Sequence, residues 1–183
     1  EQYPGVWELT EQFQAQADGN WPFQAADCAP KSLRFNSADS AYLSKTPVAA
    51  GNRKTWTWSC WIKKSSVTGN TTFFSAGSDG STRSHFMFDG TTHTLRFFDL
   101  PTSVSVITTQ VFRDQSAWYH VVLAADTTQS TASNRIKIYV NGGQVTSFSA
   151  SNYPSQNAEL QVNRNAEHAL GRGNTYYEYF DGL

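Results

Sequence analysis

Two short apolar segments followed by a tight turn constrain the fold of this chain more than any other feature. The segments cover residues 118–125 and 135–140, and both are rich in the β-branched and aromatic residues typical of strands. In the second segment apolar and polar residues alternate, so one face of the strand is expected to be buried. Asn141 and Gly142 supply the two positive-φ positions of a type I′ turn, and residues 144–148 are expected to return as the next strand. The pattern predicts a three-stranded antiparallel unit.

The same kind of pattern recurs along the chain. Residues 55–63 give the clearest example, because Trp56, Trp58, Cys60 and Ile62 occupy every second position. Turn residues separate the strand-like segments at intervals of about ten residues, which favours an all-β antiparallel sandwich or barrel. The other strands are expected at residues 33–36, 42–43, 71–76, 85–88, 95–98, 104–111, 169–170 and 176–180.

Residues 1–30 differ from the rest and are expected to form an N-terminal arm or linker, with the sandwich covering residues 31–183. A short helix is predicted over residues 10–17, with Thr10 as its N-cap and Gly19 as its stop. The arm also carries large apolar side chains that a free linker would not, namely Trp7, Phe13, Trp21 and Phe23. These side chains are expected to pack on this domain or on another subunit, and the second alternative predicts a homo-oligomer.

The charge distribution argues against two classes of partner. Lysine and arginine total 14 and aspartate and glutamate total 15, and no run of like charge occurs. We therefore expect neither nucleic-acid binding nor attachment to an anionic membrane, and no apolar stretch is long enough to insert into a bilayer. Aromatic residues make up 14% of the chain, more than a plain core requires, so some are expected to fill the sandwich and others to contact sugar rings or a partner subunit.

Two cysteines, Cys28 and Cys60, do not make a disulfide framework. Either one bridge ties the arm to the sheet, or the two thiols are unrelated. The chain begins at Glu1 and its only methionine is Met87, so we expect it to be part of a longer or processed polypeptide.

No arrangement of residues typical of catalysis occurs in the sequence. A glycosidase on a β-sandwich needs two carboxylates on one strand face, and the nearest acidic pair, Glu178 and Asp181, has the wrong parity. His120 alternates with apolar residues and is expected to be buried and hydrogen-bonded. The histidines lack both a nucleophile motif and metal-ligand spacing, and they are His85, His93, His120 and His168. The sequence therefore predicts a protein that is not an enzyme.

Several motifs, in this order, resemble laminin-G-like domains of the concanavalin A-like jelly-roll superfamily. They are SLRFNSADSAYLSKTP, RKTWTWSCWIKK, AWYHVVLAAD, RIKIYVNGGQV and the late HALGRG with YFDGL. The chain is most similar to the laminin-G-like domains of bacteriophage structural and tail-fibre-type proteins, and the resemblance covers residues 31–183. It implies a jelly-roll sandwich whose last strand, which pairs beside the first, is absent here. Residues 33–36 are then expected to form an exposed edge, unless a strand from elsewhere covers it.

The resemblance also implies a calcium site. Related domains hold Ca²⁺ at the rim of the sandwich with carboxylate, amide and carbonyl oxygens. The candidates in this chain lie at loop ends and are Asp126, Asn134, Asp79 and Asp89, of which Asp126 is favoured. The alternative is that these residues only cap turns.

A glycan-binding surface is predicted near the C-terminal end, where directional donors and aromatic rings cluster. Arginine and asparagine donate hydrogen bonds to sugar hydroxyls, and a tyrosine ring can contact the apolar face of a pyranose. The candidates are Asn163, Arg164, Asn165, Arg172, Asn174, Tyr176 and Tyr177. The alternative is an ordinary polar rim.

These observations predict a non-enzymatic recognition or structural module of a phage virion, of the tail-fibre, spike or capsid-decoration type. Such a module would lie in the virion, or otherwise outside the cell, and would contact other virion subunits through the arm and bind host-surface glycan. One alternative is an assembly protein without carbohydrate affinity, and another is a polysaccharide-degrading enzyme. The warrant is family resemblance, which concerns the fold more than the activity.

Overall fold

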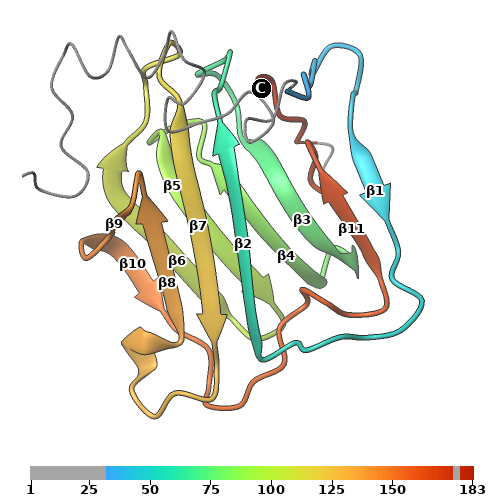
Figure 1. Ribbon diagram of the computed structural model, residues 1–183, viewed down its shortest axis with the longest axis vertical. Coiled ribbons are helices and arrows are strands. Elements are labelled where there is room, and N and C mark those ends of the chain that lie inside the picture. The colour runs from blue at the N-terminus through green and yellow to red at the C-terminus, as the bar shows by residue number, and fades with distance from the viewer. Residues whose placement is uncertain (1–31, 175–177) are drawn as a thin grey trace, which may run out of the picture. The chain divides into compact units, whose positions relative to one another are not determined.

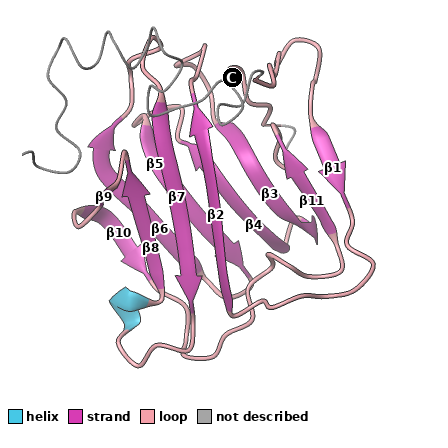
Figure 2. Ribbon diagram, in the orientation of Figure 1, coloured by secondary structure: helices cyan, strands magenta, loops and turns pink. Residues whose placement is uncertain are grey.

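The computed structural model describes residues 32–174 and 178–183, which form two antiparallel sheets packed face to face (Figures 1 and 2). The larger sheet has the order β1-β11-β3-β4-β5-β6-β10 and the smaller has the order β2-β7-β8-β9. The larger sheet contains β1 (Leu43–Lys45), β3 (Thr71–Asp79), β4 (Thr82–Phe88), β5 (Thr94–Leu100), β6 (Val104–Val111), β10 (Phe148–Asn152) and β11 (Glu167–Leu170). The smaller contains β2 (Thr55–Ile62), β7 (Tyr119–Asp126), β8 (Ile136–Val140) and β9 (Gly143–Gln144).

This architecture confirms the predicted all-β antiparallel sandwich of jelly-roll type. Within the described ranges, the only helix is the 3₁₀ turn η1 (Ala132–Asn134). None of the helices in the described part of the chain is long and apolar enough to cross a membrane. By its internal contacts the chain divides into Glu1–Leu33 and Arg34–Leu183, and both sheets belong to the second unit. The predicted helix at 10–17 and the apolar side chains of the arm lie outside the described residues.

The hairpin that organises the chain forms as predicted up to its turn. β7 pairs with β8 in antiparallel register, and Asn141 and Gly142 have φ values of 50° and 82°. The prediction that residues 144–148 continue as one strand is wrong, because β9 ends at Gln144 and β10 pairs with β6 in the other sheet. Val145 and Phe148 both pack against the core. Residues three apart on one strand point to opposite faces, so the chain must leave the strand between them.

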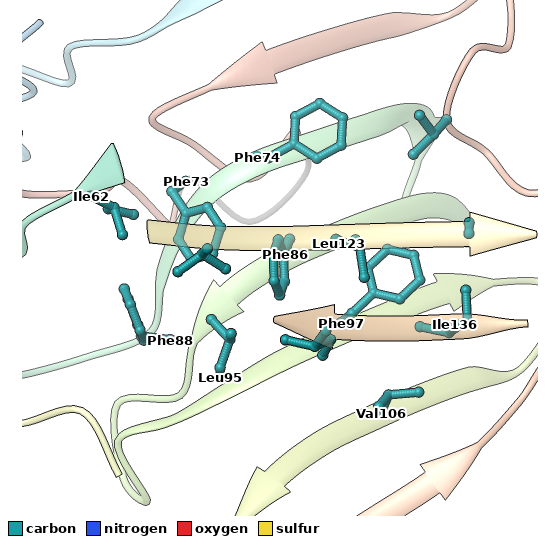
Figure 3. Packing of buried hydrophobic residues seen from close by; sticks show 14 of the residues in the cluster. Ile62, Phe73, Phe74, Phe86, Phe88, Leu95, Phe97, Val106, Leu123 and Ile136 are labelled. Atoms are coloured by element: carbon teal, nitrogen blue, oxygen red, sulfur yellow. The ribbon is translucent and has the colours of Figure 1, made fainter. Parts of the chain in front are cut away.

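The core lies between the two sheets and is built largely from aromatic rings (Figure 3). Trp58 of β2 stacks on Phe73 and Phe74, each at 5.4 Å between ring centroids, and meets the edge of Phe86 at 5.6 Å. Trp56 is also buried, which confirms the alternation predicted for residues 55–63. Cys60 carries a free thiol, and burial raises its pKa to about 12. Its possible partner, Cys28, lies outside the described residues.

The expectation that residues 33–36 form an exposed edge is wrong at Phe35. The N–H of Phe35 donates to the carbonyl of Gly182 at 2.9 Å, and the N–H of Gly182 donates back at 3.1 Å. On the other side, Leu183 and Lys63 exchange hydrogen bonds of 2.9 and 2.8 Å. Gly182 has a φ of 155°, and a Cβ there would lie 2.1 Å from the Lys63 carbonyl oxygen, so only glycine fits. In residues 178–180 the predicted strand is reduced to isolated bridges of Tyr179.

Candidate functional site

The two faces of β4 and β5 differ in role: the inner side chains build the core, and the outer side chains line a pocket. Phe86 and Phe88 of β4 point into the core. Because side chains alternate along a strand, Arg83, His85 and Met87 point to the outer face of the larger sheet. The register places His85 opposite Phe98 and Met87 opposite Arg96. An open cavity of about 450 Å³ lies on this face, and we call it the outer-face pocket. It is lined by Asn70, Arg83, Met87, Arg96, Phe98, Leu100, Ser103, Val104, Ser105 and Glu178.

Phe98 is the aromatic centre of the outer-face pocket. Its ring is partly exposed, and the guanidinium carbons of Arg83 and Arg96 lie 5.4 and 5.2 Å from its centroid. These distances fall in the range of cation–π contacts. The imidazole of His85 lies 4.9 Å from the same ring. The Nε of Arg96 is buried and has no hydrogen-bond acceptor within the described part of the protein, so this donor is left unsatisfied.

Arg172, Asn174 and Glu178 contact the outer face of β3 and β4. Ser75 Oγ donates to the carbonyl of Arg172 at 2.8 Å, and His85 Nε2 hydrogen-bonds to Asn174 Oδ1 at 2.9 Å. Thr72 Oγ1 donates to Glu178 Oε2 at 3.1 Å. These contacts hold the Glu178 carboxylate at the border of the pocket.

Glu178 is kept ionised by its surroundings. Burial opposes ionisation, but the nearby His85 imidazole and hydrogen bonds from Asn70 and Thr72 outweigh it and hold the pKa of Glu178 below its ordinary value of 4.5. Asn70 Nδ2 donates to Oε1 at 3.0 Å, and His85 Nδ1 lies 3.7 Å from Oε2. The carboxylate therefore has protein partners for both of its oxygens.

We expect Glu178→Gln to destabilise the fold at neutral pH and to have little effect in acid. Because the folded pKa lies below the unfolded value, the stabilisation is present above pH 4.5 and is lost as the pH falls through the folded pKa. The melting temperatures of wild type and variant, measured by circular dichroism between about pH 3 and pH 7, should differ most at pH 7 and converge in acid. Glu159→Gln, which removes a carboxylate from an exposed ion pair, is the control. An equal difference at both ends of the range would contradict this account of Glu178.

The residues predicted to bind glycan do not form one surface. Asn163 Nδ2 donates to the carbonyl of Asn52 at 2.7 Å and Asn165 Nδ2 donates to that of Val48 at 3.1 Å, so both amides hold the loop before β2. Arg164 donates to the Gln161 side chain at 3.1 Å. These three side chains are therefore engaged in holding the fold.

Arg172 and Asn174 are placed differently. Arg172 forms an ion pair of 2.6 Å with Glu167 and lies 3.7 Å from the centroid of the Tyr42 ring. Asn174 is the one described candidate that contacts a residue next to the pocket: it hydrogen-bonds to His85, which lies beside Phe98. The other two candidates, Tyr176 and Tyr177, lie outside the described residues.

The four candidate calcium ligands are likewise not gathered at one point. Asp79 pairs with the start of β4 and Asp89 follows its end, so they lie at opposite ends of that strand. Asp126 and Asn134 do line one cavity, of about 320 Å³. The described residues contain no group of three acidic, histidine or cysteine side chains placed to hold a metal ion. A calcium site at Asp126 stays a prediction.

The three aspartates all accept hydrogen bonds from their own turns. Asp79 accepts from the N–H of Ser81 at 2.8 Å, and Asp89 accepts from the N–H of Thr92 at 2.8 Å. Asp126 accepts from both the hydroxyl and the N–H of Thr128. These hydrogen bonds lower the pKa of each carboxylate, and they are the turn-capping contacts of the alternative reading.

His120 was predicted to be buried, and this is wrong, although it is hydrogen-bonded as predicted. Its Nε2 lies 2.9 Å from Ser59 Oγ, and its ring stacks on Trp61 at 5.1 Å. The inward positions of β7 are Val121, Leu123 and Ala125, so His120 has the parity of the outer face of the smaller sheet.

Sequence reasoning missed the residues that make the outer-face pocket, above all Arg83, Arg96 and Phe98. A signal was present, because Arg83 and His85, and likewise Arg96 and Phe98, stand two positions apart beside the apolar Phe86, Leu95 and Phe97. On a strand with one face in the core, such alternation places those side chains together on the other face.

The two packed antiparallel sheets define a β-sandwich of the lectin-like jelly-roll class. A family model described as Concanavalin A-like lectin/glucanases superfamily, of the laminin G type, matches residues 35–183, and the chain belongs to this family. None of the curated proteins matches the chain.

Several solved structures share the fold. The LG1-3 region of the laminin α2 chain has a TM-score of 0.60 and 11% identity, over 85% of this chain and 30% of that one. Domains LG4-5 of the mouse laminin α1 chain have a TM-score of 0.55 and 15% identity, over 82% of this chain and 38% of that one. A third structure is domain 4 of the extracellular arabinanase AbnA from Geobacillus stearothermophilus, in complex with arabinotriose. It has a TM-score of 0.51 and 21% identity, over 74% of this chain and 58% of that one. The chain thus spans less than two thirds of each.

Proposed function

We propose that this domain is a non-catalytic carbohydrate-binding module and that its ligand lies in the outer-face pocket. The proposal rests on Phe98, whose partly exposed ring lies between Arg83 and Arg96 while the Nε of Arg96 lacks an acceptor. Aromatic rings pack against the C–H faces of sugars, and guanidinium groups donate to their oxygens. An open pocket whose walls are both polar and apolar suits a sugar chain better than a compact apolar ligand.

The acidic side chains near the pocket support a role without catalysis. Glu178 and Asp181 line a neighbouring cavity of about 520 Å³. A glycosidase needs one carboxyl group that stays protonated near neutral pH to act as an acid. The hydrogen bonds that lower the pKa of Glu178 do the opposite, so this residue would be a poor proton donor.

We expect Phe98→Ala to weaken glycan binding about fivefold, because the loss of one aromatic contact is worth roughly 1 kcal/mol. Binding to immobilised host-surface polysaccharides should be compared for wild type, Phe98→Ala and Trp61→Ala. Trp61 is the matched control, since it is an aromatic residue with 63% exposure on the outer face of the smaller sheet.

The outcomes separate the alternatives. Loss in Phe98→Ala alone supports the outer-face pocket, whereas loss in Trp61→Ala alone would move the site to the other sheet. If the folded wild type binds none of the polysaccharides, the recognition role fails and an assembly role takes its place. Shortening of a polysaccharide by the wild type would support the enzymatic alternative instead.

On the family resemblance, the module would belong to a phage virion protein of the tail-fibre, spike or capsid-decoration type and would recognise glycan on the host surface. The arm, with Trp7, Phe13, Trp21 and Phe23, would then join it to other virion subunits, including copies of itself. Gold-labelled antibodies against the domain should decorate intact particles at the tail or capsid. Particles without label, from a lysate that contains the protein, would contradict a place in the virion.

A further inference from the structure

We propose that the outer-face pocket selects acidic glycans and that Arg96 pairs with the sugar carboxylate. The inference rests on the proposed function and names the class of sugar that the same site would take. Three observations carry it: the balance of charge in the pocket, the state of the Arg96 guanidinium, and the apolar surface beside it.

The charge of the pocket lining is unbalanced. Two guanidinium groups, those of Arg83 and Arg96, face one carboxylate, that of Glu178. Glu178 already accepts hydrogen bonds from Asn70 and Thr72 and lies 3.7 Å from His85. A ligand that brings its own negative charge would complement the excess of cationic groups among the described residues of the lining.

Arg96 is the cation best placed to meet a ligand. None of the ion pairs within the described residues includes it. Its charge acts on Asp89, but that carboxylate is held chiefly by the N–H groups of Thr92 and Thr91. The Nε of Arg96 is buried and has no acceptor among the described residues, so a ligand would meet the terminal Nη groups. The two Nη groups of a guanidinium can donate two parallel hydrogen bonds to the two oxygens of one carboxylate.

Apolar surface beside Arg96 provides a place for the sugar ring. Met87 lies opposite Arg96 in the register, and the Phe98 ring is 5.2 Å from the Arg96 guanidinium carbon. Leu100 lies on the same face of β5 and also lines the pocket. Met87 is only 1% exposed, so a sugar ring would rest on the partly exposed Phe98 and Leu100. A uronic or sialic acid seated there would carry its carboxylate, which is attached directly to the ring, toward Arg96.

The test uses pairs of polysaccharides that differ only in charge. Polygalacturonate, alginate, hyaluronan and polysialic acid would each be compared with their carboxyl-reduced derivatives by isothermal titration calorimetry at low salt. We expect at least one acidic polymer to bind about tenfold more tightly than its reduced partner, as the loss of one charge-assisted contact implies. Added salt should narrow the difference.

Arg96→Gln should abolish this preference, and Arg96→Lys, which keeps the charge but loses the paired donors, should restore only part of it. Lys137→Gln is the control, because it removes one positive charge from the outer face of the smaller sheet and should leave the preference intact. Circular dichroism would establish that each variant is folded.

Each outcome decides between the two proposals. Equal binding of acidic and reduced polymers, lost in Phe98→Ala, would overturn the acidic selection and leave the proposed function standing. A preference that persists in Arg96→Gln, or that extends equally to dextran sulfate, would overturn the pairing of Arg96 with a carboxylate. Binding to no polymer, acidic or neutral, would overturn the proposed function and this inference together.

Discussion

Replacing Phe86 with alanine is expected to lower the free energy of unfolding by about 4 kcal/mol, because it leaves a large cavity between the sheets. Phe86 is fully buried, and its ring lies 4.8 Å from that of Phe73 and 5.6 Å from that of Trp58. The Phe97 ring follows at 6.2 Å. These large rings cannot move into the space without leaving their own positions, so the cavity would stay open.

Urea unfolding of the wild type, Phe86→Ala and Phe86→Leu measures this effect. The leucine variant refills much of the volume and should lose less than half as much stability. Phe98→Ala is the matched control on the same sheet, because its ring faces outward and is partly exposed. An equal loss in Phe86→Ala and Phe98→Ala would contradict the assignment of the two faces.

Asp99→Ala is expected to lower the free energy of unfolding by about 3 kcal/mol, because three buried donors lose their acceptor. Asp99 is fully buried on the inner face of β5, where it accepts hydrogen bonds from the hydroxyls of Ser84 and Thr102. It also accepts the N–H of Gln161 at 2.8 Å. The substitution should therefore loosen the segment before β11 as well as the sheet.

The pH dependence of this loss has the opposite sign to that of Glu178. Burial raises the pKa of Asp99 above its ordinary value of 3.8, although hydrogen bonds from Ser84 and Thr102 oppose the shift. Stability linked to the raised pKa is present below pH 3.8 and falls as the pH rises through the folded pKa. Urea unfolding should thus show a larger difference between wild type and Asp99→Ala near pH 4 than near pH 8. A difference that grows with pH would be inconsistent with the raised pKa.

The strands could be predicted because their signals are local. Residues 55–63 alternate over a distance that one strand covers, and Asn141-Gly142 defines a turn by its own backbone preferences. The pairing that closes Phe35 against Gly182 has no such signal, since it joins residues at opposite ends of the sandwich. The sequence also gives no local signal that β10 joins the larger sheet, because this pairing depends on how Val145 and Phe148 pack in the folded core.

The site could not be predicted for a related reason. His85 contacts Asn174 across a separation of 89 residues, and Arg96 meets Met87, and Arg83 meets Phe98, only in the register that the folded sheet imposes. The polar cluster around Asn163 stays a predicted glycan site, but its side-chain amides also serve backbone carbonyls, a role that the sequence does not reveal. Its partner, the carbonyl of Asn52, becomes visible only in the folded chain.

The most direct test of a glycan site on the larger sheet is a nuclear magnetic resonance titration of the ¹⁵N-labelled domain with oligosaccharides of the polymer that binds best. The account predicts that the amides of β4 and β5 around His85 and Phe98 shift with saturation, together with the side-chain Nε–H of Arg96. The indole N–H of Trp61, on the outer face of the smaller sheet, should stay in place. Shifts confined to Trp61 and the smaller sheet, or to the loop after Asp126, would contradict it.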